Sequence, residues 1–149
     1  MTSTPEENKR IVRRIRDDIE EQGDLDAVDE IFAEDAVVHG LLRDFSGRDE
    51  IREMFAMDRE AFPDDTETIH DLIAEGDTVA VRMTERGTHD SEFMGIEPTG
   101  NEFEIQTMAF LRLEGGKVAE WWVQPDLLGF LRQLGVSPEE LSAAVRADD

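Results

Sequence analysis

The stretch FEIQTMAFLRLEGGKVAEWWV, residues 103–123, decides the fold. Residues 103–113 and 118–123 are rich in aromatic, β-branched and other apolar side chains, which favour strands. Gly115-Gly116 lies between them, and two adjacent glycines readily adopt the positive φ angles of a tight hairpin turn. The stretch therefore predicts two antiparallel strands joined by a two-residue turn.

A second pair of strands precedes this hairpin. Residues 66–74 and 78–88 favour strands, and Glu75-Gly76-Asp77 between them is typical of a turn. Together the four strands predict an antiparallel meander. A further short strand is expected at residues 36–39 and is ended by Gly40.

The first half of the chain carries apolar residues at helical spacing. Thr4-Pro5-Glu6-Glu7 is a capping box with proline at the first helical position, so a helix begins there. Gly23 ends this helix, Asp24 caps a second one, and Pro63 ends a third that opens at residues 46–50. The apolar stripes of the three helices are Ile11, Val12, Ile15 and Ile19; Leu25, Val28, Ile31 and Phe32; and Ile51, Met54, Phe55 and Phe62.

Residues 126–133 and 138–145 predict two final helices. Helices segregated from an antiparallel sheet predict an α+β fold. A strongly curved sheet packed against the N-terminal helices forms a cone, whose cavity suits a small molecule. We expect one domain over residues 1–149, with its core at about residues 8–135 and a helical C-terminal tail at 136–149.

Composition narrows the class of protein. A chain of 149 residues that is 39% hydrophobic is large enough for a core. No apolar run has the ~18 residues of a membrane span, and the N-terminal sequence lacks the apolar core of a signal peptide, so we expect a cytoplasmic protein. The absence of cysteine excludes disulfides and thiolate chemistry.

The chain is strongly acidic. It has 37 Asp and Glu residues against 15 Lys and Arg residues, which gives a net charge of −22. Such a field repels nucleic acid and anionic membranes, so neither is expected as a partner. Because the acids interleave with regularly spaced apolar residues, we interpret them as the surface of a folded protein, one adapted to high salt. Salt screens the repulsion, since the Debye length falls to ~3 Å at 1 M.

EWWVQPD, residues 120–126, contains the first candidate for catalysis. Strand alternation predicts that Trp122, Gln124 and Asp126 share one face and that Trp121 lies on the other, towards the helices or a partner subunit. Asp126 then lies at the mouth of the strand, beside the cavity. A carboxylate near tryptophan in an apolar cavity has a raised pKa and becomes a better base. The alternative is that Trp122 is core and Asp126 only caps the next helix, and the two roles are compatible.

Other candidates come from the ends and faces of the strands. His39 and His89 end two strands and are expected to reach the cavity mouth. Arg82 is either a salt-bridge partner or an anchor for a substrate carbonyl. Gln106 and Met108 share a face of the long strand and are expected to line the cavity. No helical histidine pair, P-loop, glycine-rich nucleotide motif or nucleophile elbow is present, so neither a metal nor a nucleotide cofactor is predicted.

A series of short strings runs along the whole chain. They are GDLD (23–26), AEDAVVH (33–39), AFPD (61–64), EGDTVAVR (75–82), GTH (87–89), FMGIEPTG (93–100), GKVAEWW (116–122), Asp126 and QLG (133–135). In this order and at this spacing they resemble the SnoaL-like polyketide (ester) cyclases of the NTF2-like superfamily. The resemblance implies an α+β cone that often forms homodimers through its sheet.

The resemblance also implies a mechanism. Cyclases of this family close a ring by intramolecular aldol condensation of a polyketide ester, without metal or cofactor, and Asp126 matches their acid/base aspartate. By the same resemblance His39, His89, Arg82 and Gln124 would position carbonyls or the enolate. Trp122 and Phe62 would be walls of the substrate pocket. Because the same cone also serves non-catalytic proteins that bind small molecules, that function is the alternative.

Overall fold

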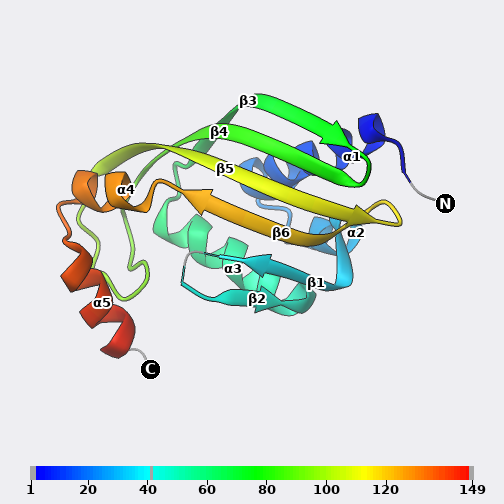
Figure 1. Cartoon of the computed structure of the whole chain (residues 1–149). Helices are drawn as coiled ribbons and strands as arrows, with labels where there is room; N and C mark the ends of the chain where they lie inside the picture. Colours follow the sequence, from blue (N-terminus) through cyan, green and yellow to red (C-terminus); the bar gives the residue numbers. More distant parts are fainter. Residues whose placement is uncertain (1–2, 41, 148–149) are drawn as a thin grey trace.

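The computed structural model describes residues 3–40 and 42–147. Helical segments from the first half of the chain cover one face of a sheet, and two short helices lie at one end of it (Figure 1). The segments are α1 (Pro5–Arg14), the π-helical η1 (Ile15–Glu21), the 3-10 turn η2 (Leu25–Ala27), α2 (Val28–Ile31), α3 (Gly47–Ala61), α4 (Leu127–Leu134) and α5 (Pro138–Ala147). The first helix starts at the predicted capping box, in which Thr4 and Glu7 each bind the other's backbone N–H.

Six strands form one curved, unclosed sheet in the order β2-β1-β6-β5-β4-β3. They are β1 (Phe32–His39), β2 (Asp44–Ser46), β3 (Thr66–Glu75), β4 (Thr78–Thr88), β5 (Glu102–Glu114) and β6 (Lys117–Pro125). The meander β3 to β6 is antiparallel, as predicted. The sheet as a whole is mixed, because β1 pairs in parallel with β6. A parallel pair needs a long crossover, and α3 with the meander supplies it.

The structure differs from the sequence predictions around residue 32. The first strand begins at Phe32 instead of residue 36, and the second helix is correspondingly short. Phe32 is buried between Phe55 and Trp121, with ring centroids 6.0 and 6.1 Å away. Tertiary packing therefore overrides the helical spacing that placed Phe32 on a helix. The short strand β2 was not predicted.

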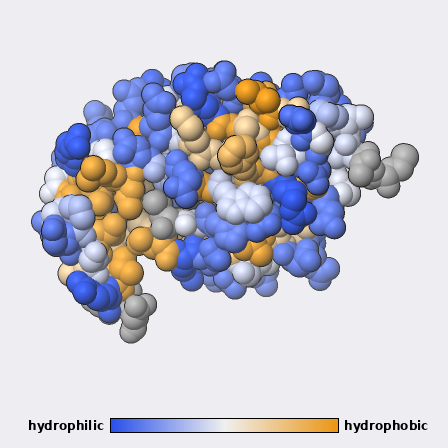
Figure 2. All heavy atoms as spheres, in the orientation of Figure 1, coloured by the Kyte–Doolittle hydropathy of each residue, from blue (hydrophilic) through white to orange (hydrophobic). Residues whose placement is uncertain are grey.

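The sheet has two unlike faces. On β5 the odd-numbered side chains, such as Ile105 and Leu111, are buried on the face that the helices cover, which we call the inner face. The even-numbered side chains lie on the opposite, outer face, where Met108 and Phe110 are 56% and 58% exposed. Figure 2 shows apolar surface over the middle of this exposed side of the sheet. Alternation along a pleated strand produces this division.

A row of side chains crosses the outer face from one edge region to the other. Cross-strand pairing aligns Ile73 with Ala80, Ala80 with Phe110, Phe110 with Trp122, and Trp122 with His39. Ile73 and Phe110 are exposed, and the ring of Trp122 is stacked on that of His39. The row is an apolar strip on the side of the sheet turned away from the helices.

Candidate active site

A cavity of about 630 Å³ lies between the inner face of the sheet and α3. Aromatic and aliphatic side chains form most of its wall. Among them are Phe45, Phe55, Phe62, Phe93, Phe130 and Trp121. The size and the largely apolar lining are those of a small-molecule site.

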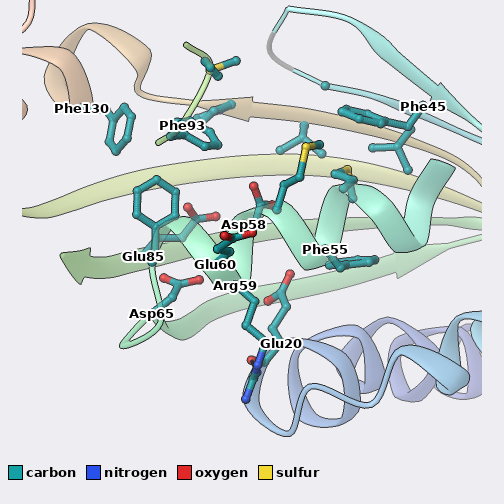
Figure 3. A pocket seen from close by; sticks show the side chains of 18 of the residues that line it. Glu20, Phe45, Phe55, Asp58, Arg59, Glu60, Asp65, Glu85, Phe93 and Phe130 are labelled. Carbon is teal, nitrogen blue, oxygen red and sulfur yellow. Dashed lines mark hydrogen bonds between the residues drawn. The ribbon is translucent and has the colours of Figure 1, made fainter. Parts of the chain in front are cut away.

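Five carboxyl groups from separate elements line one part of this cavity. They are Glu20 from η1, Asp58 from α3, Asp65 from the loop before β3, Glu67 from β3 and Glu85 from β4. Figure 3 shows Glu20, Asp58, Asp65 and Glu85 pointing toward a common space. Glu67 and Glu85 are direct cross-strand partners. We call these five residues the carboxyl cluster.

The local pattern of each segment explains these positions. Glu85 continues the alternation of Val79, Val81 and Met83, all buried on the inner face of β4. Asp58 lies three residues after Phe55 and so on the same helical face of α3, and both residues line the cavity. The signal that could have revealed the cluster is therefore an acid placed within an apolar repeat. Sequence reasoning missed it because one acid among 37 carries little information by itself.

Burial is the main cause of raised pKa values in the cluster. It raises the pKa of Asp58 to about 7, with a further contribution from the Glu67 charge. It raises the pKa of Asp65 to about 8, with contributions from Glu67, Asp58 and Asp64. The pKa of Glu85 is well above its ordinary range, through burial and then the charges of Glu67, Asp65 and Asp58. Near neutral pH the cluster therefore contains both protonated and ionised carboxyls.

Glu20 and Glu67 form a carboxyl pair within the cluster. Burial, and then the Glu67 charge, raises the pKa of Glu20 well above its usual range. Burial also raises the pKa of Glu67, but its hydrogen bond with Glu20 and the nearby Arg16 charge limit the rise. The pKa of Glu20 is therefore raised further than that of Glu67.

Asp126 lies outside the cavity wall as the N-cap of α4. Its Oδ1 accepts a hydrogen bond from the Gly129 N–H at 2.9 Å, and the residue is exposed. A side chain at position 129 would collide with this carboxylate, so glycine there leaves room for the cap. Its neighbours Pro125 and Leu127 do line the cavity. Asp126 is thus at the strand mouth, as expected, with its carboxylate engaged in capping.

Trp121 lies on the side of the helices, as predicted, but Trp122 is not a wall of the cavity. Trp121 is 6% exposed and lines the cavity, between Phe32 and Phe55. Trp122 is on the outer face and 38% exposed. The alternation was predicted correctly, but the cavity was expected on the wrong side of the sheet. The cavity lies on the helix-covered side, which is the side of Trp121.

His39 is also on the outer side of the sheet and does not reach the cavity. Its Nδ1 lies 3.1 Å from Asp44 Oδ1 and its Nε2 lies 2.6 Å from Glu120 Oε2. Its ring stacks on Trp122 with centroids 5.5 Å apart. The hydrogen bond with Glu120 raises the pKa of His39 and lowers the pKa of Glu120. This is the arrangement of an imidazolium held between two carboxylates.

His89 is fully buried behind the cavity wall. Its Nδ1 accepts a hydrogen bond from the Thr99 N–H at 3.2 Å, and its ring packs against Phe62. Burial lowers the pKa of His89, so the ring is neutral near pH 7. With Nδ1 as acceptor, the proton resides on Nε2. In the described residues His89 is not a lining residue of the cavity.

The remaining predicted binding residues divide between the two faces. Phe62 lines the cavity, as predicted. Arg82 forms an ion pair with Asp71 at 2.6 Å, which is the salt-bridge alternative. The expectation that Gln106, Met108, Trp122 and Gln124 line the cavity is wrong. These four even-numbered residues lie on the outer face of β5 and β6, because the odd-numbered residues of the two strands face inward.

Residues 3–40 and 42–147 contain neither a metal site nor a membrane-spanning helix. No group of three His, Asp or Glu side chains there has the arrangement of a metal site. No helix in that part of the chain is long and apolar enough to cross a membrane.

Comparison with known proteins assigns the chain to a family. The sequence profile of the SnoaL-like polyketide cyclases matches residues 10–134. The chain belongs to this family. IdmH of Streptomyces antibioticus, a proposed polyketide cyclase, is 32% identical to this SnoaL-like protein, with a TM-score of 0.73. That match covers 87% of this chain and 99% of IdmH.

Two further solved structures agree with this assignment. AclR of Streptomyces galilaeus, a proposed hydroxylase, is 28% identical, with a TM-score of 0.77 over 91% of this SnoaL-like chain and 100% of AclR. TsrD of Streptomyces laurentii is 24% identical and shows the likeness of fold, with a TM-score of 0.82 over 91% and 100% of the two chains. No curated protein sequence matches the chain. The predicted α+β, NTF2-like cone and the predicted family are confirmed.

Proposed function

We propose that this protein is a cofactor-free acid/base enzyme that acts on a small, largely apolar, carbonyl-containing molecule in the cavity. The reaction class is aldol-type ring closure or a related isomerase or lyase step. The observation that supports it is the carboxyl cluster inside a cavity of about 630 Å³ with a largely apolar wall. A buried carboxyl with a pKa near the working pH is a suitable catalyst for moving protons to and from carbon.

The chemistry needs one ionised and one protonated carboxyl. With a pKa of about 7, Asp58 is ionised in about half of the molecules at neutral pH and can take a proton from a carbon beside a carbonyl. The resulting enolate carbon attacks a second carbonyl and forms the new carbon–carbon bond. Asp65, with a pKa of about 8, then donates its proton to the oxygen of the attacked carbonyl. Asp58 ends protonated and Asp65 ionised, so one proton passed from Asp58 to Asp65 restores the starting state.

Asp126 is the competing candidate for the base. Family resemblance supports it, and its backbone follows Pro125, which lines the cavity. Its carboxylate is exposed and caps α4, whereas the carboxyls of the cluster line the cavity. We therefore assign proton abstraction to Asp58 and test both residues together.

The test is proton exchange at carbon, which does not require the natural substrate. We expect the protein to accelerate exchange of the α-protons of β-tetralone in D2O, followed by NMR, and Asp58→Asn to remove about 10²-fold or more of the acceleration. Glu75→Gln changes an exposed acid of β3 outside the cavity and is the matched control. If Asp126→Asn abolishes exchange while Asp58→Asn does not, the base is Asp126. If the protein binds the ketone without accelerating exchange, it is a binding protein.

We also propose that the protein forms a homodimer through the outer face of the sheet. Ile73, Met108, Phe110 and Trp122 are exposed there on neighbouring strands. A contiguous apolar patch of this kind marks an interaction surface. An isologous contact of this face with itself would bury the strip in both protomers.

The proposed setting is a cytoplasm of high salt. The net charge of −22 and the many exposed acids support it. Molar salt screens repulsion between surface carboxylates and stabilises the compact state. The melting temperature is expected to rise between dilute buffer and molar KCl, and a constant value would contradict this setting.

A further inference from the structure

The carboxyl cluster lacks a basic partner of its own. Within residues 3–40 and 42–147, none of its five members has a lysine, arginine or histidine nitrogen within 4.0 Å in an ion pair. Buried acids in proteins are normally paired, since an isolated buried charge is costly. A ligand that enters the cavity therefore meets ionised carboxylates, or protonated carboxyls that can lose their protons.

The neighbouring arginines are bound elsewhere. Arg59 donates from its Nη1 to the backbone carbonyl of Glu20 at 3.0 Å. Arg16 pairs with Glu21 at 3.1 Å, and Arg43 lies 4.2 Å from the centroid of the Phe45 ring. In Figure 3 the Arg59 side chain extends away from Asp65 and Glu85. Although Arg43 and Arg59 also line the cavity, no arginine of the described residues forms an ion pair with the cluster, so a cationic ligand would meet carboxyls that are free of such pairs.

Three buried polar atoms beside the cavity have no hydrogen-bond partner among the described residues. Glu20 Oε2 and Asp65 Oδ1 are inaccessible and have no hydrogen-bond partner among the described residues, and both side chains line the cavity. Trp121, 6% exposed and also a lining residue, has an unpartnered indole Nε1–H, a donor that suits a carbonyl oxygen of a ligand and not its cationic group. Such atoms are almost always satisfied in folded proteins. Two of them are acceptors on acids, which suit a donor that carries positive charge.

The rest of the wall defines the remainder of the ligand. Phe45, Phe55 and Trp121 line the same cavity and offer apolar contact to a carbon skeleton. Aromatic faces also attract a nearby ammonium group, with tryptophan the strongest. A metal ion does not fit, because the described acids include no three-residue metal arrangement. An organic cation is the remaining class.

We propose that the cavity selects a substrate that carries a protonated amine on an apolar, carbonyl-containing body. The ammonium group binds among Glu20, Asp65, Glu67 and Glu85, and the body packs against the aromatic wall. This specificity rests on the proposed function only in placing the substrate in this cavity. An amine at this point also neutralises part of the cluster, so bound substrate changes how many protons its carboxyls hold.

The first test compares two probes of the same shape. Naphthylethylamine is cationic at pH 7.5, whereas naphthylethanol is neutral, and both are titrated by calorimetry. We expect the amine to bind about tenfold more tightly or better, as charged hydrogen bonds allow. Glu67→Gln/Glu85→Gln should reduce this preference to about twofold or less, while Glu75→Gln should retain it. Naphthylethanol is expected to bind the double variant as well as the wild type, which shows that the cavity is intact.

The second readout is the release of protons. A bound ammonium lowers the pKa of neighbouring carboxyls, so Glu20 and Glu85, whose pKa values burial raises well above their ordinary range, should lose protons when the amine binds. The calorimetric enthalpy of amine binding should then differ between phosphate and Tris buffers, and that of the alcohol should not. Equal affinity for the two probes, no binding of either, or a preference that survives in the double variant would overturn the proposal. Proton exchange on β-tetralone is measured separately. A negative result for amine binding therefore contradicts the amine specificity and does not decide the proposed acid/base function.

Discussion

Glu67 on β3 and Glu85 on β4 are direct cross-strand neighbours on the inner face of the sheet, and both line the cavity. Like charges at opposed positions of an antiparallel pair normally destabilise a sheet. Burial raises the pKa of both groups, and for Glu85 the Glu67 charge adds to that rise. The fold thus accepts an unfavourable pair at the place where a ligand would bind, as is common at functional sites.

Glu85→Gln is expected to stabilise the free protein at pH 8. The substitution removes an unpaired buried acid and its repulsion with Glu67, so we expect a gain of about 1 kcal/mol and a rise of about 2–4 °C in Tm. Thermal denaturation at pH 8 measures it. Glu75→Gln, exposed on the same strand pair, should stay within about 0.5 kcal/mol of the wild type. A fall in the Tm of the Glu85 variant would show that its carboxylate is paired in solution.

The protein should become less stable as the pH rises from about 4 to about 8. Asp58 and Asp65 have folded-state pKa values of about 7 and 8, above the ordinary 3.8 that applies when they are unfolded. In this window the folded state binds more protons than the unfolded state, so the free energy of unfolding decreases with pH. The pH profile of the Asp58→Asn variant, measured by denaturant titration, should be flatter than that of the wild type. Equal slopes would place Asp58 outside the buried cluster.

Ligand binding should be reported by one tryptophan and not by the other. Trp121 lines the cavity, whereas Trp122 lies on the outer face. We expect Trp121→Phe to lose the change in fluorescence caused by naphthylethanol and Trp122→Phe to keep it. The reverse result would place the ligand on the outer face of the sheet.

Two substitutions at Asp126 separate capping from chemistry. Asn caps a helix about as well as Asp, whereas Ala does not, so Asp126→Ala should cost about 1 kcal/mol of stability and Asp126→Asn little. Gly129→Ala should resemble Asp126→Ala, because its methyl group would displace the capping carboxylate. Thermal denaturation of the three variants tests this. A stable Asp126→Ala would mean that the cap observed at 2.9 Å contributes little.

The proposed dimer should dissociate when charge is placed on the outer face. Phe110 is 58% exposed in the middle of the apolar strip, so Phe110→Glu is expected to convert the protein to a monomer in sedimentation experiments. Leu128, 57% exposed on α4, is the matched control, because Leu128→Glu adds the same charge away from the strip. A monomeric wild type, or dissociation by the control alone, would contradict the outer-face dimer.

The sequence by itself determined the elements and their class. The Gly115-Gly116 turn, the strand alternation and the capping box at Thr4 are local features, and each appears in the structure where it was predicted. The α+β cone followed from the order of these elements. Phe32 is where a local pattern failed, since contacts with Phe55 and Trp121 place it in a strand.

Only the tertiary structure decided which face of the sheet encloses the cavity and which acids meet inside it. Alternation separates Trp121 from Trp122 but cannot tell which side the helices cover, because that depends on how the sheet curves and packs. Likewise Glu20, Asp58 and Glu85 are far apart in the chain and approach one another only when η1, α3 and β4 assemble. Each acid is ordinary by itself, and burial together gives the group its raised pKa values.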